Sequence, residues 1–158
     1  MPKRSAGILL YRVQDGAGPR VLLVHPGGPF WAKKDAGAWS IPKGEYEEGD
    51  DPLAAALREF EEETGARVGG DGLLELGTIR LRGGKLVTAW AAEGEFDVSA
   101  LKSNTFTMEW PPRSGTTREF PEVDRAEWFD PAEAGRRLNP AQAEFVDRLV
   151  QALASGGA

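Results

Sequence analysis

The pattern of apolar positions predicts that the chain begins with strands. Residues 5–13 and 20–25 are both apolar, and residues 14–19 between them are rich in Gly, with Asp and Pro, which favours a turn. The two stretches are therefore expected to pair as a β-hairpin. Residues 39–44 alternate apolar and polar positions, and Pro42 places this short strand at a sheet edge or a strand end.

The rest of the chain is expected to return to strands and to end in helices. Residues 73–81 alternate apolar and polar side chains as a half-buried strand does, and residues 86–96 form the returning strand after a glycine turn. Residues 97–118 are polar and rich in Ser and Thr, which predicts a long loop. A capping Asp or Asn precedes each of two final helices, expected at residues 131–138 and 140–154.

One helix with two recognisable ends is expected at residues 52–64. Asp51 is a good N-cap, because its carboxylate accepts hydrogen bonds from backbone N–H groups of the first turn. Gly65 favours the left-handed conformation that closes a helix. Apolar side chains recur at i, i+4 and i+7 and form one buried stripe, made by Leu53, Leu57 and Phe60.

Three carboxylates share a face of this helix beside the apolar stripe. Glu59, Glu62 and Glu63 stand at i, i+3 and i+4, whereas Glu61 points away from them. Like charges at this spacing repel by about a few tenths of a kcal/mol per pair. A hard divalent cation such as Mg²⁺ or Ca²⁺ would reverse that sign, because such ions require oxygen ligands. The spacing alone leaves open the alternative of a solvated acidic face on a surface helix.

The helix and the loop before it resemble the Nudix box. That pattern is Gly, five residues, Glu, seven residues, Arg-Glu-apolar, one residue, Glu-Glu, one residue, Gly, apolar. The matching positions are Gly44, Arg58, Glu59, Phe60, Glu62, Glu63, Gly65 and Ala66. Asp50 departs from the pattern, because it stands where the first Glu is expected. The resemblance implies a Nudix hydrolase, which cleaves a nucleoside diphosphate linked to another group, and an α/β fold in which an α/β/α sandwich surrounds a mixed β-sheet.

The resemblance also implies roles for individual residues. The residues expected to bind divalent ions are Gly44 through its carbonyl, Glu59, Glu62, Glu63 and Glu122. Mg²⁺ is the expected ion, with Mn²⁺ as a substitute. Glu62, Glu63 or Glu122 would take the proton of the attacking water. Arg58 is expected to orient the carboxylates, since Glu62 lies at i+4 from it.

Two short motifs indicate the substrate class. The Trp-x-x-Pro-Lys-Gly entrance at residues 39–44 is similar to that of the diadenosine polyphosphate hydrolases, and so is the Pro-Glu-apolar stretch six residues before Trp128. Diadenosine polyphosphates are therefore the first expected substrate, before nucleoside triphosphates, nucleotide sugars and diphosphoinositol phosphates. The candidate substrate-binding residues are Lys43, Lys3, Arg12, Trp31 and Trp110. A surface charge or a loop anchor is the alternative for each of them.

Composition narrows the class of protein. The 158 residues suit one domain, expected over residues 1–158 with a disordered tail at 155–158. The lack of cysteine excludes disulfides and thiolate metal sites, and His25, the single histidine, excludes sites built from several histidines. We expect His25 to be structural.

Charge and hydropathy indicate which partners the protein binds and where in the cell it is expected. A net charge of −6 argues against a general binder of duplex nucleic acid. No apolar run is long enough for a membrane span, and no export signal precedes the first strand, so the cytoplasm is the expected location. The expected partner is a small nucleotide, and the oligomeric state stays open. The alternative to an enzyme is a Nudix-fold module that binds or senses nucleotides without catalysis.

Overall fold

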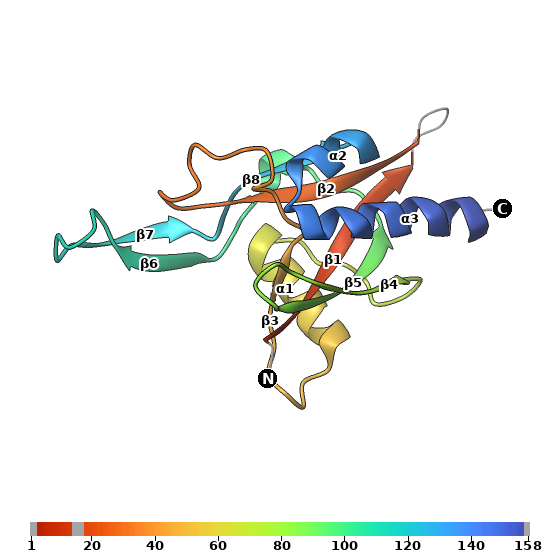
Figure 1. The fold of residues 1–158 in the computed structure, drawn as a ribbon, viewed down its shortest axis with the longest axis horizontal. Helices are drawn as coiled ribbons and strands as arrows, with labels where there is room; N and C mark the ends of the chain where they lie inside the picture. The colour runs from red at the N-terminus through yellow and green to blue at the C-terminus, as the bar shows by residue number, and fades with distance from the viewer. Residues whose placement is uncertain (1–2, 14–17, 157–158) are drawn as a thin grey trace.

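A mixed β-sheet forms the centre of the computed structural model, which describes residues 3–13 and 18–156 (Figure 1). Its strands are β1 (Arg4–Val13), β2 (Pro19–Pro26), β3 (Lys43–Glu45), β4 (Leu74–Arg80), β5 (Leu86–Glu93) and β8 (Val123–Phe129). Their order across the sheet is β4–β5–β1–β2–β8, and β3 pairs with the beginning of β1. β1 runs parallel to β5 and antiparallel to β2 and β3.

The N-terminal hairpin expected from the apolar pattern is confirmed, with Tyr11 of β1 opposite Val21 of β2. Residues 14–17 of its expected turn lie outside the described residues. β1 is buried on both faces, because Leu9 and Tyr11 belong to one core and Ile8 belongs to the other. A strand covered on both faces reads as a continuous apolar run rather than as an alternating one.

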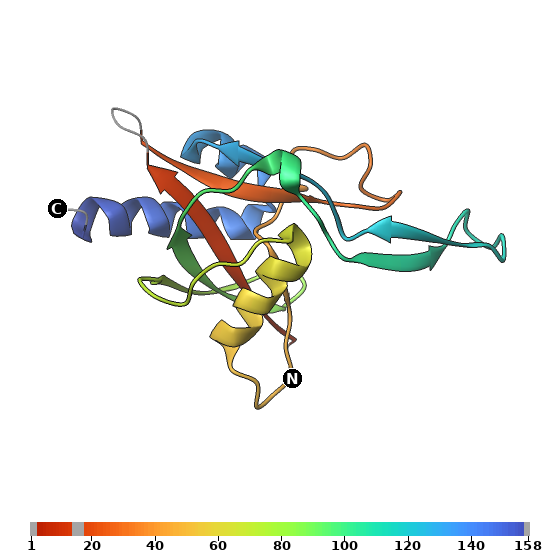
Figure 2. The same cartoon turned by 180° about the vertical axis from the view of Figure 1, so that it is seen from behind.

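Helices cover both faces of the sheet (Figure 1, Figure 2). They are α1 (Pro52–Thr64), α2 (Pro131–Arg137) and α3 (Ala143–Gly156). α1 packs on one face, where Phe60 is fully buried, and α2 and α3 pack on the other, where Phe145 is fully buried. The expected α/β/α sandwich around a mixed sheet is confirmed. No helix within residues 3–13 and 18–156 is both long enough and apolar enough to cross a membrane.

α1 begins and ends as its sequence predicts. The Asp51 side chain accepts a hydrogen bond from the backbone N–H of Ala54, and Pro52 occupies the first helical position. Gly65 closes the helix with φ 83°, and its N–H donates to the carbonyl of Glu61. The two ends of α1, and with them the residues that fall on its glutamate face, are therefore defined by local signals.

The C-terminal helices differ from expectation at their boundaries. α2 follows its predicted cap, Asp130. Asn139 caps a single 3₁₀ turn, η2 (Pro140–Gln142), and α3 begins only after this turn. Ser155 and Gly156, expected to belong to a loose tail, lie in α3, and residues 157–158 of that tail lie outside the described residues.

The strand expected at residues 39–44 is interrupted. Trp39 and Ser40 form isolated β-bridges, and β3 begins at Lys43. Pro42 lies within the interruption, where it has no N–H to donate to a neighbouring strand.

The prediction of a long loop at residues 97–118 is wrong. The segment contains a 3₁₀ turn, η1 (Val98–Ala100), and a two-stranded sheet of β6 (Thr105–Glu109) and β7 (Thr117–Pro121), with Phe106 opposite Phe120. This hairpin projects from the body of the molecule (Figure 1, Figure 2). Its threonines favour strands because they are β-branched, so the local β-propensity decides the structure although the segment is polar.

Candidate functional site

A cavity of ≈ 270 Å³ lies between the C-terminal part of α1, the beginning of β8 and the segment after β2. We call residues 27–38 the cavity loop. Trp31 from this loop, Lys43 from β3, Glu63 from α1 and Glu122 before β8 all line the cavity. The fold thus brings together four of the side chains nominated from the sequence.

Gly44 places β3 directly against the glutamate face of α1. A Cβ atom at Gly44 would lie 2.1 Å from the Cδ atom of Glu59, so any larger residue would displace this carboxylate. The absence of a side chain at Gly44 therefore makes room for the Glu59 carboxylate. The role expected from the sequence is a different one, in which the Gly44 carbonyl binds a divalent ion. The Gly44 backbone remains close to the same carboxylate.

Burial and neighbouring carboxylates raise the pKa values of Glu59, Glu63 and Glu122. Burial raises the pKa of Glu63 to about 8, with the charges of Glu59 and Glu122 adding to the effect and Lys43 opposing it. Burial and then Glu62 raise the pKa of Glu59, and the same two causes raise the pKa of Glu122. The charged forms of Glu59, Glu63 and Glu122 are therefore disfavoured when no cation is present.

Backbone hydrogen bonds connect Glu122 to α1, and Asn104 is the residue that sequence reasoning missed. The Asn104 N–H donates to the carbonyl of Glu62 at 2.8 Å, and the Glu122 N–H donates to the carbonyl of Asn104 at 2.8 Å. The Gly27 N–H then donates to the carbonyl of Glu122 at 2.9 Å. This chain of three bonds fixes Glu122 between α1 and the cavity loop. Main-chain bonds leave no side-chain pattern in a sequence, so no signal could have revealed them.

The donor chemistry of this cluster fits a hard divalent cation. Within the described ranges, no three acidic or histidine side chains already surround one point as a metal cage. The groups present are nevertheless carboxylates that raise one another's pKa, which is the arrangement that an oxygen-binding ion such as Mg²⁺ would relieve. Thiolate ligands are absent from the sequence, which has no cysteine. Glu59, Glu62 and Glu63, with Glu122, are the residues that would hold the ion.

Arg58 and Glu61 lie as the helical spacing predicts. The Arg58 guanidinium lies 3.6 Å from a Glu59 oxygen and 3.9 Å from a Glu62 oxygen, so it can orient both carboxylates. Glu61 points elsewhere and pairs with Arg67 at 2.8 Å. Asp50, the departure from the expected Glu, accepts a hydrogen bond from the N–H of Glu47 within the loop before α1.

Two candidate substrate contacts do not reach the cavity. Arg12 pairs with Glu95 at 3.0 Å, and its guanidinium lies 4.3 Å from the ring centre of Trp128. Gly7 faces Lys43, and Arg12 lies five residues further along β1, or roughly 17 Å at the usual strand rise. Lys3 lies beside Glu45 at 4.0 Å, at the rim of a separate hollow that none of the helix glutamates lines.

The aromatic candidates Trp31 and Trp110 lie near each other, but only Trp31 lines the cavity. Trp110 follows β6 and meets Phe30 of the cavity loop edge to face, with ring centres 5.8 Å apart. Phe106 of β6 also packs against the loop, because a Cβ atom at Gly28 would lie 3.0 Å from its ring. The projecting hairpin therefore contacts the loop from outside, with Trp110 against Phe30 and Phe106 against Gly28.

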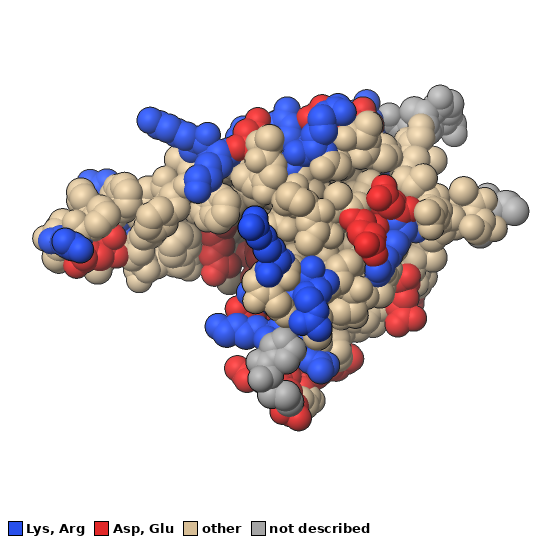
Figure 3. All heavy atoms as spheres, viewed as in Figure 1, with Lys and Arg blue, Asp and Glu red and all other residues tan. Residues whose placement is uncertain are grey.

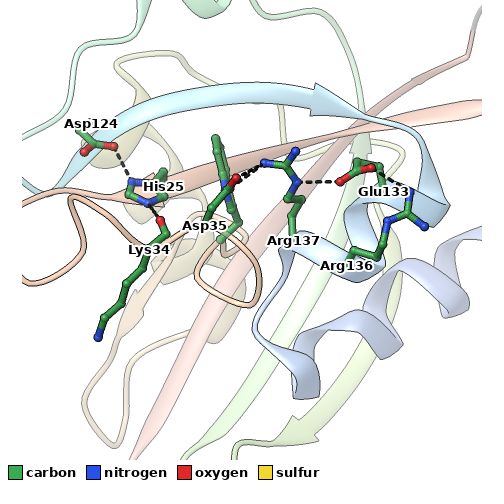
Figure 4. Close-up of polar contacts among 8 residues, drawn as sticks. His25, Lys34, Asp35, Asp124, Glu133, Arg136 and Arg137 are labelled. Atoms are coloured by element: carbon green, nitrogen blue, oxygen red, sulfur yellow. Dashed lines mark hydrogen bonds and ion pairs between the residues drawn. The ribbon is translucent and has the colours of Figure 1, made fainter.

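Ion pairs and hydrogen bonds hold the other end of the cavity loop against α2 (Figure 4). The Asp35 carboxylate accepts from Arg137 at 2.6 and 2.7 Å and from the indole N–H of Trp39 at 2.7 Å. Glu133 in turn accepts from Arg137 and Arg136. Lys and Arg side chains gather over α2 and over the loop after β2, so the negative net charge is not spread evenly (Figure 3).

The raised pKa of Glu63 predicts a pH-dependent stability for the metal-free protein. Glu63 binds a proton up to pH of about 8 in the folded state, whereas its ordinary pKa is 4.5. The folded state therefore holds more protons than the unfolded state between these values, and its stability is lost as pH rises through this window. Melting temperatures measured in EDTA should fall from pH 4.5 to about 8, and Glu63→Gln should reduce the slope. Parallel curves for the two proteins would contradict this account.

Comparison with known proteins adds a family and a fold. A family model described as the NUDIX domain matches residues 1–149. An octanoyltransferase from Myxococcus xanthus is 32% identical over 139 residues, which cover 87% of this chain but 33% of that protein. Nudix hydrolase 25 from Arabidopsis thaliana is 59% identical over 29 residues, which cover 18% of this chain and 17% of that protein. The chain thus spans a third or less of the length of these relatives.

Two solved structures share the fold. An Ap4A hydrolase binary complex from C. elegans has a TM-score of 0.66 and 22% identity, covering 96% of this chain and 98% of that one. The NUDIX domain of Shewanella oneidensis NrtR, complexed with ADP ribose, also has a TM-score of 0.66, with 16% identity over 97% of this chain and 89% of that one. At these identities the likeness concerns the fold alone.

Proposed function

The chain belongs to the Nudix family, and on that basis we propose that it is a metal-dependent phosphohydrolase. The proposed substrate is a nucleoside polyphosphate or a nucleoside diphosphate linked to another group. One observation carries the proposal: the half-buried Glu63, whose pKa is raised to about 8, lines a cavity together with Glu122 and Lys43. A cavity with acidic groups at one side and a lysine beside them suits a phosphate chain that arrives with a cation.

Each side chain has a separate part in the proposed reaction. A bound divalent ion would supply charge neutralisation and a more acidic water. Glu63 or Glu122 would accept the water's proton, because a raised pKa suits a base that works near neutral pH. Lys43 would donate to a phosphate oxygen, and Trp31 would contact the base or sugar from the cavity loop. Arg58 would keep Glu59 and Glu62 in orientation.

The finer proposal is that the substrate is a diadenosine polyphosphate. It is supported by the Trp-x-x-Pro-Lys-Gly entrance, which brings Lys43 to the cavity, and by the aromatic wall that Trp31 provides. Nucleoside triphosphates are the second choice. The net charge of −6 supports a small nucleotide rather than duplex nucleic acid as the partner.

The alternative is a Nudix-fold module that binds or senses nucleotides without catalysis. The intact set of Glu59, Glu62 and Glu63 beside Gly44 favours the enzyme, because binding alone does not require a cluster of mutually repelling carboxylates.

Hydrolysis with and without metal distinguishes these functions. The protein would be incubated with diadenosine polyphosphates, nucleoside triphosphates and nucleotide sugars in Mg²⁺, Mn²⁺ or EDTA, and the products separated by anion exchange. We expect turnover only with metal, and millimolar Mg²⁺ should raise the melting temperature. Nucleotide binding without turnover in either metal would favour the module. No effect of Mg²⁺ or Mn²⁺ on melting would contradict the metal site.

Lys43→Ala tests the choice of substrate. Lys43 lines the cavity, and a lost charge-assisted hydrogen bond to phosphate weakens binding by about 1.5–3 kcal/mol. A tetraphosphate-bridged dinucleotide should therefore lose about tenfold or more in kcat/KM, and a nucleotide sugar should lose less. Equal losses for both substrates, measured side by side, would count against a diadenosine polyphosphate.

A further inference from the structure

His25 is a fully buried titratable group that the proposed reaction does not use. It is the penultimate residue of β2, and Pro26 separates it from the cavity loop. Its Nδ1 atom lies 2.8 Å from Oδ1 of Asp124, and its Nε2 atom lies 2.6 Å from the carbonyl oxygen of Lys34 (Figure 4). The imidazole therefore bridges β8 and the far part of the cavity loop.

Both groups that face the ring are acceptors. A carbonyl oxygen only accepts, and so does an ionised carboxylate. A neutral imidazole has one N–H, so it would leave one ring nitrogen facing an oxygen with no proton between them. Such a contact is costly for a side chain with no exposed surface. A ring with protons on both nitrogens satisfies Lys34 and Asp124 together.

The surrounding charges are compatible with a positive ring. The Asp124 side chain lies on one side, and it keeps a third of its surface exposed. Trp39 meets the ring edge to face at 5.2 Å, and Arg125, the cross-strand neighbour of His25, has its guanidinium 5.1 Å from the Trp39 ring centre. Asp35 on the cavity loop is already paired with Arg137.

The hydrogen bond from His25 to the Lys34 carbonyl is connected to the cavity wall by backbone hydrogen bonds within the cavity loop. The Lys34 N–H donates to the carbonyl of Trp31 at 3.0 Å, and the Trp31 N–H donates to the carbonyl of Gly28 at 3.3 Å. Trp31 lines the cavity. Holding the Lys34 carbonyl therefore also restrains the backbone at Trp31.

We propose that His25 is a positioning residue: its imidazole carries protons on both ring nitrogens and clamps the cavity loop to β8 so that Trp31 stays in the cavity wall. The effect on turnover rests on the proposed phosphohydrolase function, whereas the protonation and the stability of the loop do not. Glu122 is also held to α1 through Asn104, which lies outside the cavity loop, so the clamp should affect substrate binding more than the chemical step.

Nitrogen NMR of the ring tests the protonation state without ambiguity, because His25 is the only histidine in the chain. We expect both ring nitrogens of the wild-type protein to show protonated-type ¹⁵N shifts near neutral pH. Asp124→Asn should convert the ring to one protonated and one bare nitrogen, because an amide can donate to the bare Nδ1 atom. A bare ring nitrogen in the wild-type protein would overturn the proposal.

Hydrogen exchange tests the clamp, and Asp124 variants avoid replacing a fully buried side chain. Asp124→Ala should speed exchange at residues 28–36 by about tenfold, with α1 unchanged, because a neutral ring then no longer ties the loop to β8. Asp124→Asn is the matched control, because it keeps both hydrogen bonds and should stay within about threefold of wild type. Unchanged exchange in Asp124→Ala would overturn the clamp.

Kinetics separate this proposal from the proposed function. If the protein turns over a nucleotide, Asp124→Ala should raise KM by about fivefold and change kcat by less than about twofold. A loosened loop with an unchanged KM would overturn the positioning role. If no substrate is cleaved, the proposed function fails, and NMR and hydrogen exchange still decide whether His25 clamps the loop.

Discussion

Glu63→Gln should lower kcat by on the order of 10²-fold or more at saturating Mg²⁺. Glutamine has the same shape, but it carries no charge for a divalent ion and cannot accept a proton from water. Glu63 is the side chain that the cavity shares with α1, and its pKa of about 8 shows how strongly burial and neighbouring carboxylates oppose its charge in the absence of metal. Steady-state rates over a range of Mg²⁺ concentrations would measure the effect.

Glu61→Gln is the matched control, because Glu61 lies on the same helix and carries the same charge. It pairs with Arg67 and points away from the carboxylate cluster. Its replacement should leave kcat within about threefold of wild type, since surface ion pairs contribute little. Equal losses at Glu61 and Glu63 would show that the glutamate face of α1 is not the site.

Glu122→Gln should lower kcat by at least about tenfold and alter the acid limb of the pH–rate profile. Burial and the charge of Glu62 raise the pKa of Glu122, so a proton on this carboxylate affects catalysis at a higher pH than an ordinary glutamate would. If Glu122 is a metal ligand instead, the variant should need more Mg²⁺ for half-maximal rate. Titrating the metal at several pH values distinguishes the two roles.

Glu119→Gln in β7 and Glu127→Gln in β8 are the controls for Glu122. Both side chains are exposed and lie on either side of it in sequence, outside the cavity. Each variant should stay within about threefold of wild type. Should Glu122→Gln behave like these two at saturating Mg²⁺, the catalytic carboxylates are confined to α1.

The parts of the fold that the sequence predicted are those with local signals. The ends of α1 follow from Asp51, Pro52 and Gly65, whose effects act within one helical turn. The spacing of the glutamates and the pairing of Arg58 with Glu62 follow from the same helix. These features need no knowledge of the rest of the chain.

The predictions failed where the structure depends on contacts between residues that are distant in the sequence. Polarity suggested a loop at residues 97–118, but paired β-strands satisfy the backbone there although most of the side chains are solvated. Arg12 and Lys3 were nominated by charge alone, and a strand pattern does not say which end of β1 meets the cavity, so their role as phosphate contacts stays a prediction although neither lines the cavity. The position of Glu122 depends on main-chain bonds through Asn104, for which residue identity gives no sign.

The projecting β6–β7 hairpin offers a site at which other groups can be attached to the protein. Its base is fixed at Asn104 and Glu122, whereas residues 111–117 around its tip are exposed. Loop tips of this kind accept inserted sequence more readily than the elements that carry a site. A fluorophore, an affinity peptide or an immobilisation point placed at Ser114 would therefore report on the molecule or hold it on a surface while the carboxylate cluster, at the other end of the arm, stays accessible.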